Sequence, residues 1–132
     1  MGYTVGLEDA ALRCRTRADA EAAAGVVSQF PEMCPYHLQV SLRSMSNPPR
    51  DDSWVLEVDH FSGDHWDDDA AIKLWLALAP YLANGATIEF QGEDLWRWRI
   101  RWEEGRVVEE YVKEVIWAEN RELLPPQKDI VP

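Results

Sequence analysis

Residues 96–102, WRWRIRW, alternate large apolar side chains with arginines without a break. Because successive side chains of a β-strand point to opposite faces, this alternation predicts a strand with one apolar face and one charged face. We expect the apolar face to lie in a core beneath helices and the arginines to meet glutamates such as Glu89 across the sheet. A nucleic-acid platform is disfavoured, because the arginines would lie on the opposite face from the stacking rings. The apolar side chains are Trp96, Trp98, Ile100 and Trp102.

Periodicity along the rest of the chain predicts two helices and several further strands. Apolar residues recur with a helical period over residues 16–30, where Thr16 is a candidate N-cap, and over residues 69–82. The apolar stripe of the second helix is expected to comprise Ile72, Trp75, Leu76, Ala79 and Leu82, widened by Leu74, Leu78 and Tyr81. Residues 106–117 fit a helix or a strand, and the hairpin turn before them together with their Val, Ile, Tyr and Trp content favours a strand. The other segments predicted to be extended are 3–15, 36–43, 54–61 and 86–90.

This order of elements predicts an α+β fold. We expect a single antiparallel or mixed sheet with two helices on one face, in ferredoxin-like (βαββαβ) order with an added C-terminal β-hairpin. The chain is long enough for one domain with its own core, which we place at residues 1–120, followed by a C-terminal tail at 121–132. Such folds serve enzymes, ligand sensors and binding modules alike, so the function has to come from particular residues.

Acidic charge is concentrated in the middle of the chain. The formal net charge is -11 at pH 7, and within residues 51–95 Lys73 is the only basic residue. A negative field repels nucleic-acid phosphates and anionic lipid, so we expect neither direct nucleic-acid binding nor membrane binding. A basic protein partner is favoured instead. The N-terminus does not resemble a signal peptide and no apolar stretch is long enough to span a bilayer, so we expect a cytoplasmic protein.

The first functional hypothesis is a non-enzymatic protein-interaction module, inhibitor- or immunity-like. In this hypothesis the acidic region 51–95 binds a basic protein partner, as in small acidic inhibitors, nucleic-acid mimics and immunity proteins of phage or toxin systems, although no motif of such proteins is present. A monomer and a homodimer are both open, since edge pairing of the C-terminal strand would give a dimer. The expected partner-binding residues are Asp64, Asp67, Asp68, Asp69, Glu93 and Asp94.

The alternative hypothesis is a small-ligand-binding or catalytic domain. It would use an aromatic pocket between the sheet and the second helix, largely apolar with a few polar groups. The same aromatic side chains are equally compatible with a core. The residues expected to line the pocket are Trp54, His60, Trp66, Trp75 and Tyr81.

Motifs for catalysis or cofactor binding are absent from the sequence, which contains no GxSxG, HExxH, GxGxxG or P-loop pattern. Residues 59–69 offer histidines and aspartates, but they match no standard metal loop, and aspartates before a helix commonly cap it. We therefore expect no catalytic residue, no metal site and no cofactor, with a weak divalent-cation site at 59–69 left open. Cys14 and Cys34 are expected to be two buried thiols, with a disulfide as the alternative.

Overall fold

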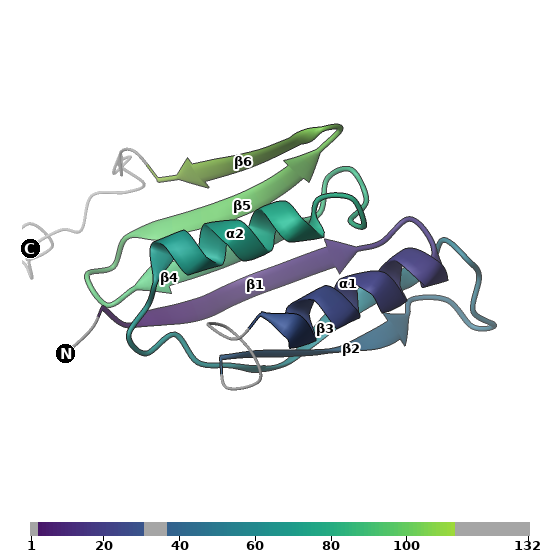
Figure 1. The fold of residues 1–132 in the computed structure, drawn as a ribbon, viewed down its shortest axis with the longest axis horizontal. Coiled ribbons are helices and arrows are strands. Elements are labelled where there is room, and N and C mark those ends of the chain that lie inside the picture. Colours follow the sequence, from purple (N-terminus) through teal and green to yellow (C-terminus); the bar gives the residue numbers. More distant parts are fainter. Residues whose placement is uncertain (1–2, 31–36, 113–132) are drawn as a thin grey trace, which may run out of the picture.

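The computed structural model describes residues 3–30 and 37–112, which form a six-stranded sheet covered on one face by two helices (Figure 1). The helices are α1 (Arg17–Gln29) and α2 (Asp68–Leu78). The sheet has the strand order β2-β3-β1-β4-β5-β6. The strands are β1 (Val5–Arg13), β2 (Leu38–Ser44), β3 (Trp54–Phe61), β4 (Thr87–Gly92), β5 (Arg97–Glu103) and β6 (Arg106–Tyr111).

The helices and strands lie close to the predicted segments, but the ferredoxin-like prediction is wrong for this sheet. The strand order is β2-β3-β1-β4-β5-β6, and every neighbouring pair is antiparallel, which also excludes the mixed alternative. Its centre is irregular, since β1 pairs with β3 only over Leu12 and Arg13, and at the other end of β1 an isolated bridge joins Val5 to Gly63, which follows β3. Tight turns return β5 and β6 to the edge of the preceding strand, so both extend the same sheet beyond β4.

Several predictions concern residues that the structure does not describe. The strand prediction for 106–117 is confirmed over β6, whereas 113–117, the tail at 121–132 and Cys34 lie outside the described residues. Cys14 is a buried free thiol. Burial, followed by the nearby charge of Asp19, raises the pKa of Cys14 to about 11, so the group stays protonated at neutral pH.

Both helices begin at capping residues. The Thr16 hydroxyl accepts a hydrogen bond from the Asp19 N–H at 3.0 Å, which confirms the predicted cap of α1. The Asp67 carboxylate caps α2 by accepting from the Ala70 N–H at 3.1 Å. α2 ends at Leu78, earlier than predicted, because Pro80 cannot continue a helix.

The buried face of α2 differs from the predicted stripe. Ile72 and Leu76 were expected to face inward, but they are 39% and 56% exposed. Apolar residues occur almost all round this helix, so the sequence period alone does not decide which stripe meets the sheet. The buried residues of α2 are Ala70, Ala71, Leu74, Trp75 and Leu78.

The apolar face of β5 forms the core beneath α2, as predicted for three of its four members. Ile100 and Trp102 are buried and Trp98 packs against the core, whereas Trp96 precedes β5 and is 53% exposed. The Trp102 indole Nε1 donates a hydrogen bond to the Trp75 carbonyl at 3.0 Å. That carbonyl lies in the last turn of α2, where helix carbonyls lack intrahelical partners. Trp102 therefore fills the core and also provides a hydrogen-bond donor for a carbonyl at the C-terminal end of α2.

Both helices lie on one face of the sheet (Figure 1), and the opposite face carries ion pairs across β4, β5 and β6. Arg99 Nε lies 2.7 Å and Arg101 Nε 3.1 Å from Glu110 Oε1, and Arg97 pairs with Glu89. The arginines therefore meet glutamates across the strands as predicted. Hydrogen bonds from Arg101 and Arg99 lower the pKa of Glu110. Pairs as exposed as these stabilise a fold only slightly, so their main effect is to neutralise charge on this face.

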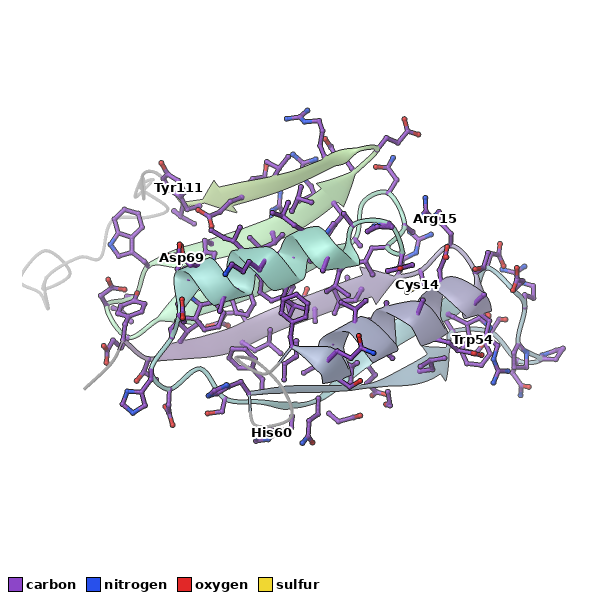
Figure 2. All side chains as sticks on the ribbon, in the orientation of Figure 1. Cys14, Arg15, Trp54, His60, Asp69 and Tyr111 are labelled. Atoms are coloured by element: carbon purple, nitrogen blue, oxygen red, sulfur yellow. The ribbon has the colours of Figure 1, made fainter. Side chains whose placement is uncertain are left out.

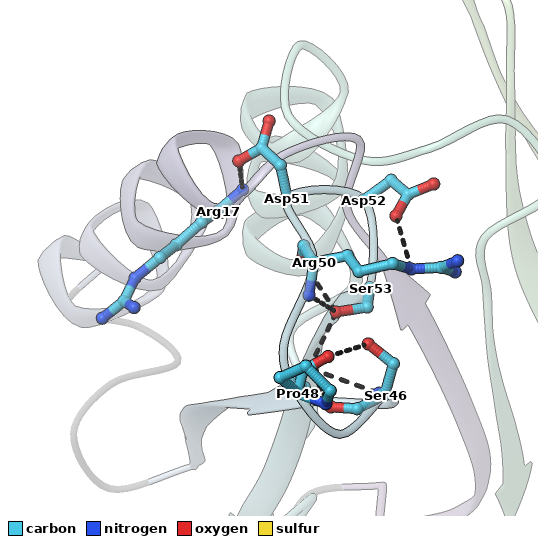
Figure 3. A network of polar contacts seen from close by, with 8 residues as sticks. Arg17, Ser46, Pro48, Arg50, Asp51, Asp52 and Ser53 are labelled. Atoms are coloured by element: carbon cyan, nitrogen blue, oxygen red, sulfur yellow. Dashed lines mark hydrogen bonds and ion pairs between the residues drawn. The ribbon is translucent and has the colours of Figure 1, made fainter.

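The β2–β3 loop is held by the hydroxyl of Ser53 (Figure 3). Ser53 is buried, and its Oγ donates to the Arg50 carbonyl at 2.8 Å and accepts from the Arg50 N–H at 3.0 Å. The neighbouring Asp51 carboxylate accepts from the Arg17 N–H at 3.2 Å and so joins this loop to the start of α1. The loop is thus fastened to the end of the molecule where α1 begins.

We predict that Trp102→Phe lowers the free energy of unfolding by roughly 2–4 kcal/mol, because the smaller ring leaves a cavity and an unpaired helix carbonyl. Urea unfolding followed by circular dichroism measures this change. Trp96→Phe is the matched control, since its exposed ring should alter stability by no more than about 0.5 kcal/mol. Equal losses in the two variants would contradict the assigned role of Trp102.

Candidate functional site

The start of β1 fastens two loops together at one end of the sheet. The Val5 N–H donates to the Gly63 carbonyl at 3.0 Å on one side, and Val5 is opposite Gly92 of β4 on the other. The preceding residues extend this contact, since the Trp66 N–H donates to the Tyr3 carbonyl at 2.8 Å. The loop before α2 and the β4–β5 turn therefore lie on either side of residues 3–5.

Glycine is required where β1 meets the loop before α2. A Cβ atom at Gly63 would overlap the backbone of Val5, so a larger residue would push the loop away from the strand. This close approach sets the position of the acidic segment that follows.

The structure brings the six predicted partner-binding carboxylates to this end of the molecule. The start of α2, the β4–β5 turn and the start of β1 lie together in Figure 1, and Asp69 is labelled at this end in Figure 2. All six side chains are exposed, and none is in an ion pair with any residue that the structure describes. Negative charge is thus left unneutralised here, in contrast to the paired face of the sheet. The six are Asp64, Asp67, Asp68, Asp69, Glu93 and Asp94.

An aromatic pocket opens between these carboxylates and β6. Its volume is about 440 Å³. The rings of Trp66 and Trp98 meet at 65° with centroids 6.3 Å apart, and those of Trp96 and Tyr111 meet at 74° and 6.1 Å. Both pairs have edge-to-face geometry, so the pocket walls include ring faces with different orientations. The pocket is lined by Tyr3, Trp66, Asp68, Trp96, Trp98, Glu109 and Tyr111.

Strand register and a strained turn place the rings of the pocket. Trp98 of β5 and Tyr111 of β6 are opposite each other in the antiparallel ladder, so their side chains emerge on the same face. Trp96 follows Leu95, which has a φ of 71°, and the Trp96 N–H donates to the Asp94 carboxylate at 3.2 Å. The turn therefore directs Trp96 out of the core and toward the end of β6.

The carboxylates around the pocket perturb one another and Tyr3. The Tyr3 hydroxyl donates to the Asp94 carboxylate. Partial burial and this hydrogen bond raise the pKa of Tyr3 to about 12, while the hydroxyl lowers the pKa of Asp94. Across the pocket, partial burial and the charge of Asp68 raise the pKa of Glu109. A bound cation would relieve the repulsion between Glu109 and Asp68.

The residues predicted to form a ligand pocket are not gathered in one place. Figure 2 shows Trp54 at the opposite end of the molecule from Asp69 and Tyr111, and the Arg17 guanidinium lies 4.7 Å from the centroid of the Trp54 ring. His60 is exposed on β3, Trp75 is buried in α2, and Tyr81 is half-buried after that helix. Trp66 alone of these five lines the aromatic pocket.

Most of the residues in the observed pocket were missed by sequence reasoning. Trp96 and Trp98 were expected in the core, and Tyr3, Glu109 and Tyr111 were not considered as site residues. The sequence did contain one signal. Trp96 directly follows the turn residues 93–95, so it can precede the strand instead of belonging to it.

The described residues offer neither a cluster of metal-binding side chains nor a membrane-spanning helix. Within 3–30 and 37–112 no three His, Cys, Asp or Glu side chains are grouped so that they could hold a metal ion. In the same residues no helix combines the length and apolar character needed to cross a membrane.

A scan of protein-family models, a search of curated proteins and a search of solved structures each gave no match to this chain. Its function is therefore inferred from the acidic, aromatic end of the molecule.

We predict that Tyr3→Phe raises the pKa of Asp94 toward its ordinary value, because the hydroxyl that stabilises the carboxylate is lost. A lowered native pKa stabilises the fold above the ordinary carboxyl pKa, and this contribution is lost as pH falls through the lowered value. Carboxyl-detected NMR titration measures the shift. Tyr111→Phe is the control and should leave the Asp94 titration unchanged, so an equal shift in both variants would refute the Tyr3–Asp94 bond.

Proposed function

We propose that this protein is a non-enzymatic protein-interaction module that binds a basic protein partner through the acidic end built from the loop before α2 and the β4–β5 turn. The observation that supports it is the gathering of six exposed carboxylates, none of them ion-paired within the described residues, at one end of the fold. Elsewhere on the described surface, carboxylates such as Glu57, Glu89 and Glu110 already pair with arginines. A cationic surface would gain most from contact with the unpaired set.

Charge and aromatic surface have complementary roles at this end. Unpaired surface charges attract an oppositely charged partner at long range and accelerate association more than they strengthen the final complex. Exposed tryptophan and tyrosine side chains are the residues that most often supply short-range binding energy at protein interfaces. Trp96 and Tyr111, which are 53% and 58% exposed, lie beside the carboxylates and suit that second role.

We predict that neutralising Asp64, Asp69 and Glu93 together weakens binding of a lysine-rich peptide by roughly tenfold, since three exposed ion pairs amount to about 1–2 kcal/mol. Calorimetric titration at increasing salt measures the affinity, which should fall as salt screens the charges. NMR shift mapping should place the largest changes at residues 62–69 and 92–96.

The matched control neutralises Glu21, Asp52 and Glu104, which belong to α1, the β2–β3 loop and the β5–β6 turn at the other end of the molecule (Figure 1). It changes the net charge equally and should preserve most of the affinity. Equal weakening in the two triple variants would show that only net charge matters. The absence of salt-dependent binding to any lysine-rich peptide would overturn the proposed function.

A further inference from the structure

The aromatic pocket combines ring faces with carboxylates in a way that suits one kind of ligand. Five aromatic residues line it, from residue 3, the loop before α2, the β4–β5 turn, β5 and β6. Asp68 and Glu109 are the two carboxylates in the lining. A neutral apolar ligand would fill the space but would leave the like charges of Asp68 and Glu109 without a counter-ion.

A cation would interact favourably with both the aromatic rings and the carboxylates of the lining. Ring faces attract positive charge through their quadrupole, and the attraction reaches about 2 kcal/mol where the cation is desolvated. Asp68 and Glu109 both line the pocket, so their like charges repel each other, and a positive group between them would remove that repulsion. The expected ligand is therefore a cation with a largely apolar outer surface.

Among protein side chains, a methylated lysine fits this description better than lysine itself. The lysine ammonium group is compact and strongly hydrated, and it needs three hydrogen-bond acceptors when it leaves water. Methyl groups replace its N–H donors and spread the charge over a wider apolar surface, which aromatic cages recognise. Aromatic rings are the larger part of this lining, so they favour the methylated form.

We propose that the aromatic pocket is a cage for a methylated lysine side chain on the basic protein partner, with Trp96 and Tyr111 as the exposed wall and Glu109 and Asp68 as the counter-charge. This assignment rests on the proposed function, because it takes the partner to be a basic protein. It adds a chemical specificity that the carboxylates alone do not provide.

The test compares one lysine-rich peptide in four forms, with a single central side chain that is lysine, trimethyllysine, the neutral tert-butyl isostere of trimethyllysine, or alanine. The trimethyllysine peptide should bind roughly tenfold more tightly than the lysine peptide, the gain expected from about 1.4 kcal/mol of cation–π attraction. The neutral isostere should lose most of that gain. Equal affinity for the trimethyllysine peptide and its isostere would overturn the cage, because apolar contact would then explain the binding.

Variants on the wall of the pocket identify where the preference arises. Trp96→Ala should abolish the preference for trimethyllysine while leaving the urea midpoint unchanged, since the ring is largely exposed. Leu95→Ala is the matched control, because Leu95 is also exposed and adjacent but does not line the pocket. Glu109→Gln should reduce the preference several-fold. A preference that survives Trp96→Ala, or that Leu95→Ala removes equally, would overturn the assignment.

Two further outcomes separate the cage from the proposed function. If all four peptides bind equally, with affinity that depends on salt and on Asp64, Asp69 and Glu93, the cage is overturned and the basic-partner module stands. If tetramethylammonium alone binds the pocket and no lysine-rich peptide binds, the basic-partner module is overturned, together with the assignment of the ligand to a protein side chain.

Discussion

Strand β1 is the element on which the rest of the structure depends, because it pairs with both β3 and β4 and so joins the two halves of the sheet. Its first residues also fasten the loop before α2 to the β4–β5 turn through Val5 and Tyr3. These two segments are separated by α2 and β4 in the sequence. Without the pairing of β1 at its start, the carboxylates of the two segments would have no reason to lie at the same end.

Charge is distributed over the molecule in two different ways. On the helix-free face, arginines from β5 alternate with glutamates from β4 and β6, and the opposite charges meet within the sheet. At the end formed by the two loops, the aspartates and glutamates form no ion pair with any residue that the structure describes. Asp67 and Asp69 are compatible with the fold there because the first turn of a helix favours negative charge. The same local preference that starts α2 also leaves its charges free for other contacts.

Local sequence patterns predicted the positions of the helices and strands well, but they predicted the arrangement of the strands in the sheet poorly. The alternation in WRWRIRW correctly indicated a strand with Ile100 and Trp102 inward, and Thr16 marked the start of α1. The ferredoxin-like prediction was wrong because period and turn signals identify strands without revealing how the strands pair across the sheet, as at the short β1–β3 contact. The buried face of α2 was predicted wrongly because apolar residues lie on several sides of this helix. Such a helix can pack on the sheet in more than one rotation about its axis.

Prediction of the site had the same limits. Charge counting identified the acidic residues, and those at 64–69 are adjacent in sequence, but only β1 brings Glu93 and Asp94 beside them. The alternation in WRWRIRW placed Trp96 in the core together with Trp98. Alternation indicates which side chains share a face of a strand, but it does not indicate where the strand begins. Tyr111 and Glu109 gave no signal, because their role depends on the register between β5 and β6.

The number of helices has a geometric consequence. Each strand takes up about 4.8 Å of a sheet, so six of them occupy roughly 29 Å, whereas two helices, each about 10 Å in diameter, cover about 20 Å. In Figure 1, α1 and α2 lie over the strands from β2 to β5, and β6 extends beyond them. The aromatic pocket therefore lies where the sheet extends beyond the two helices that cover it. A third helix over β6 would fill this space.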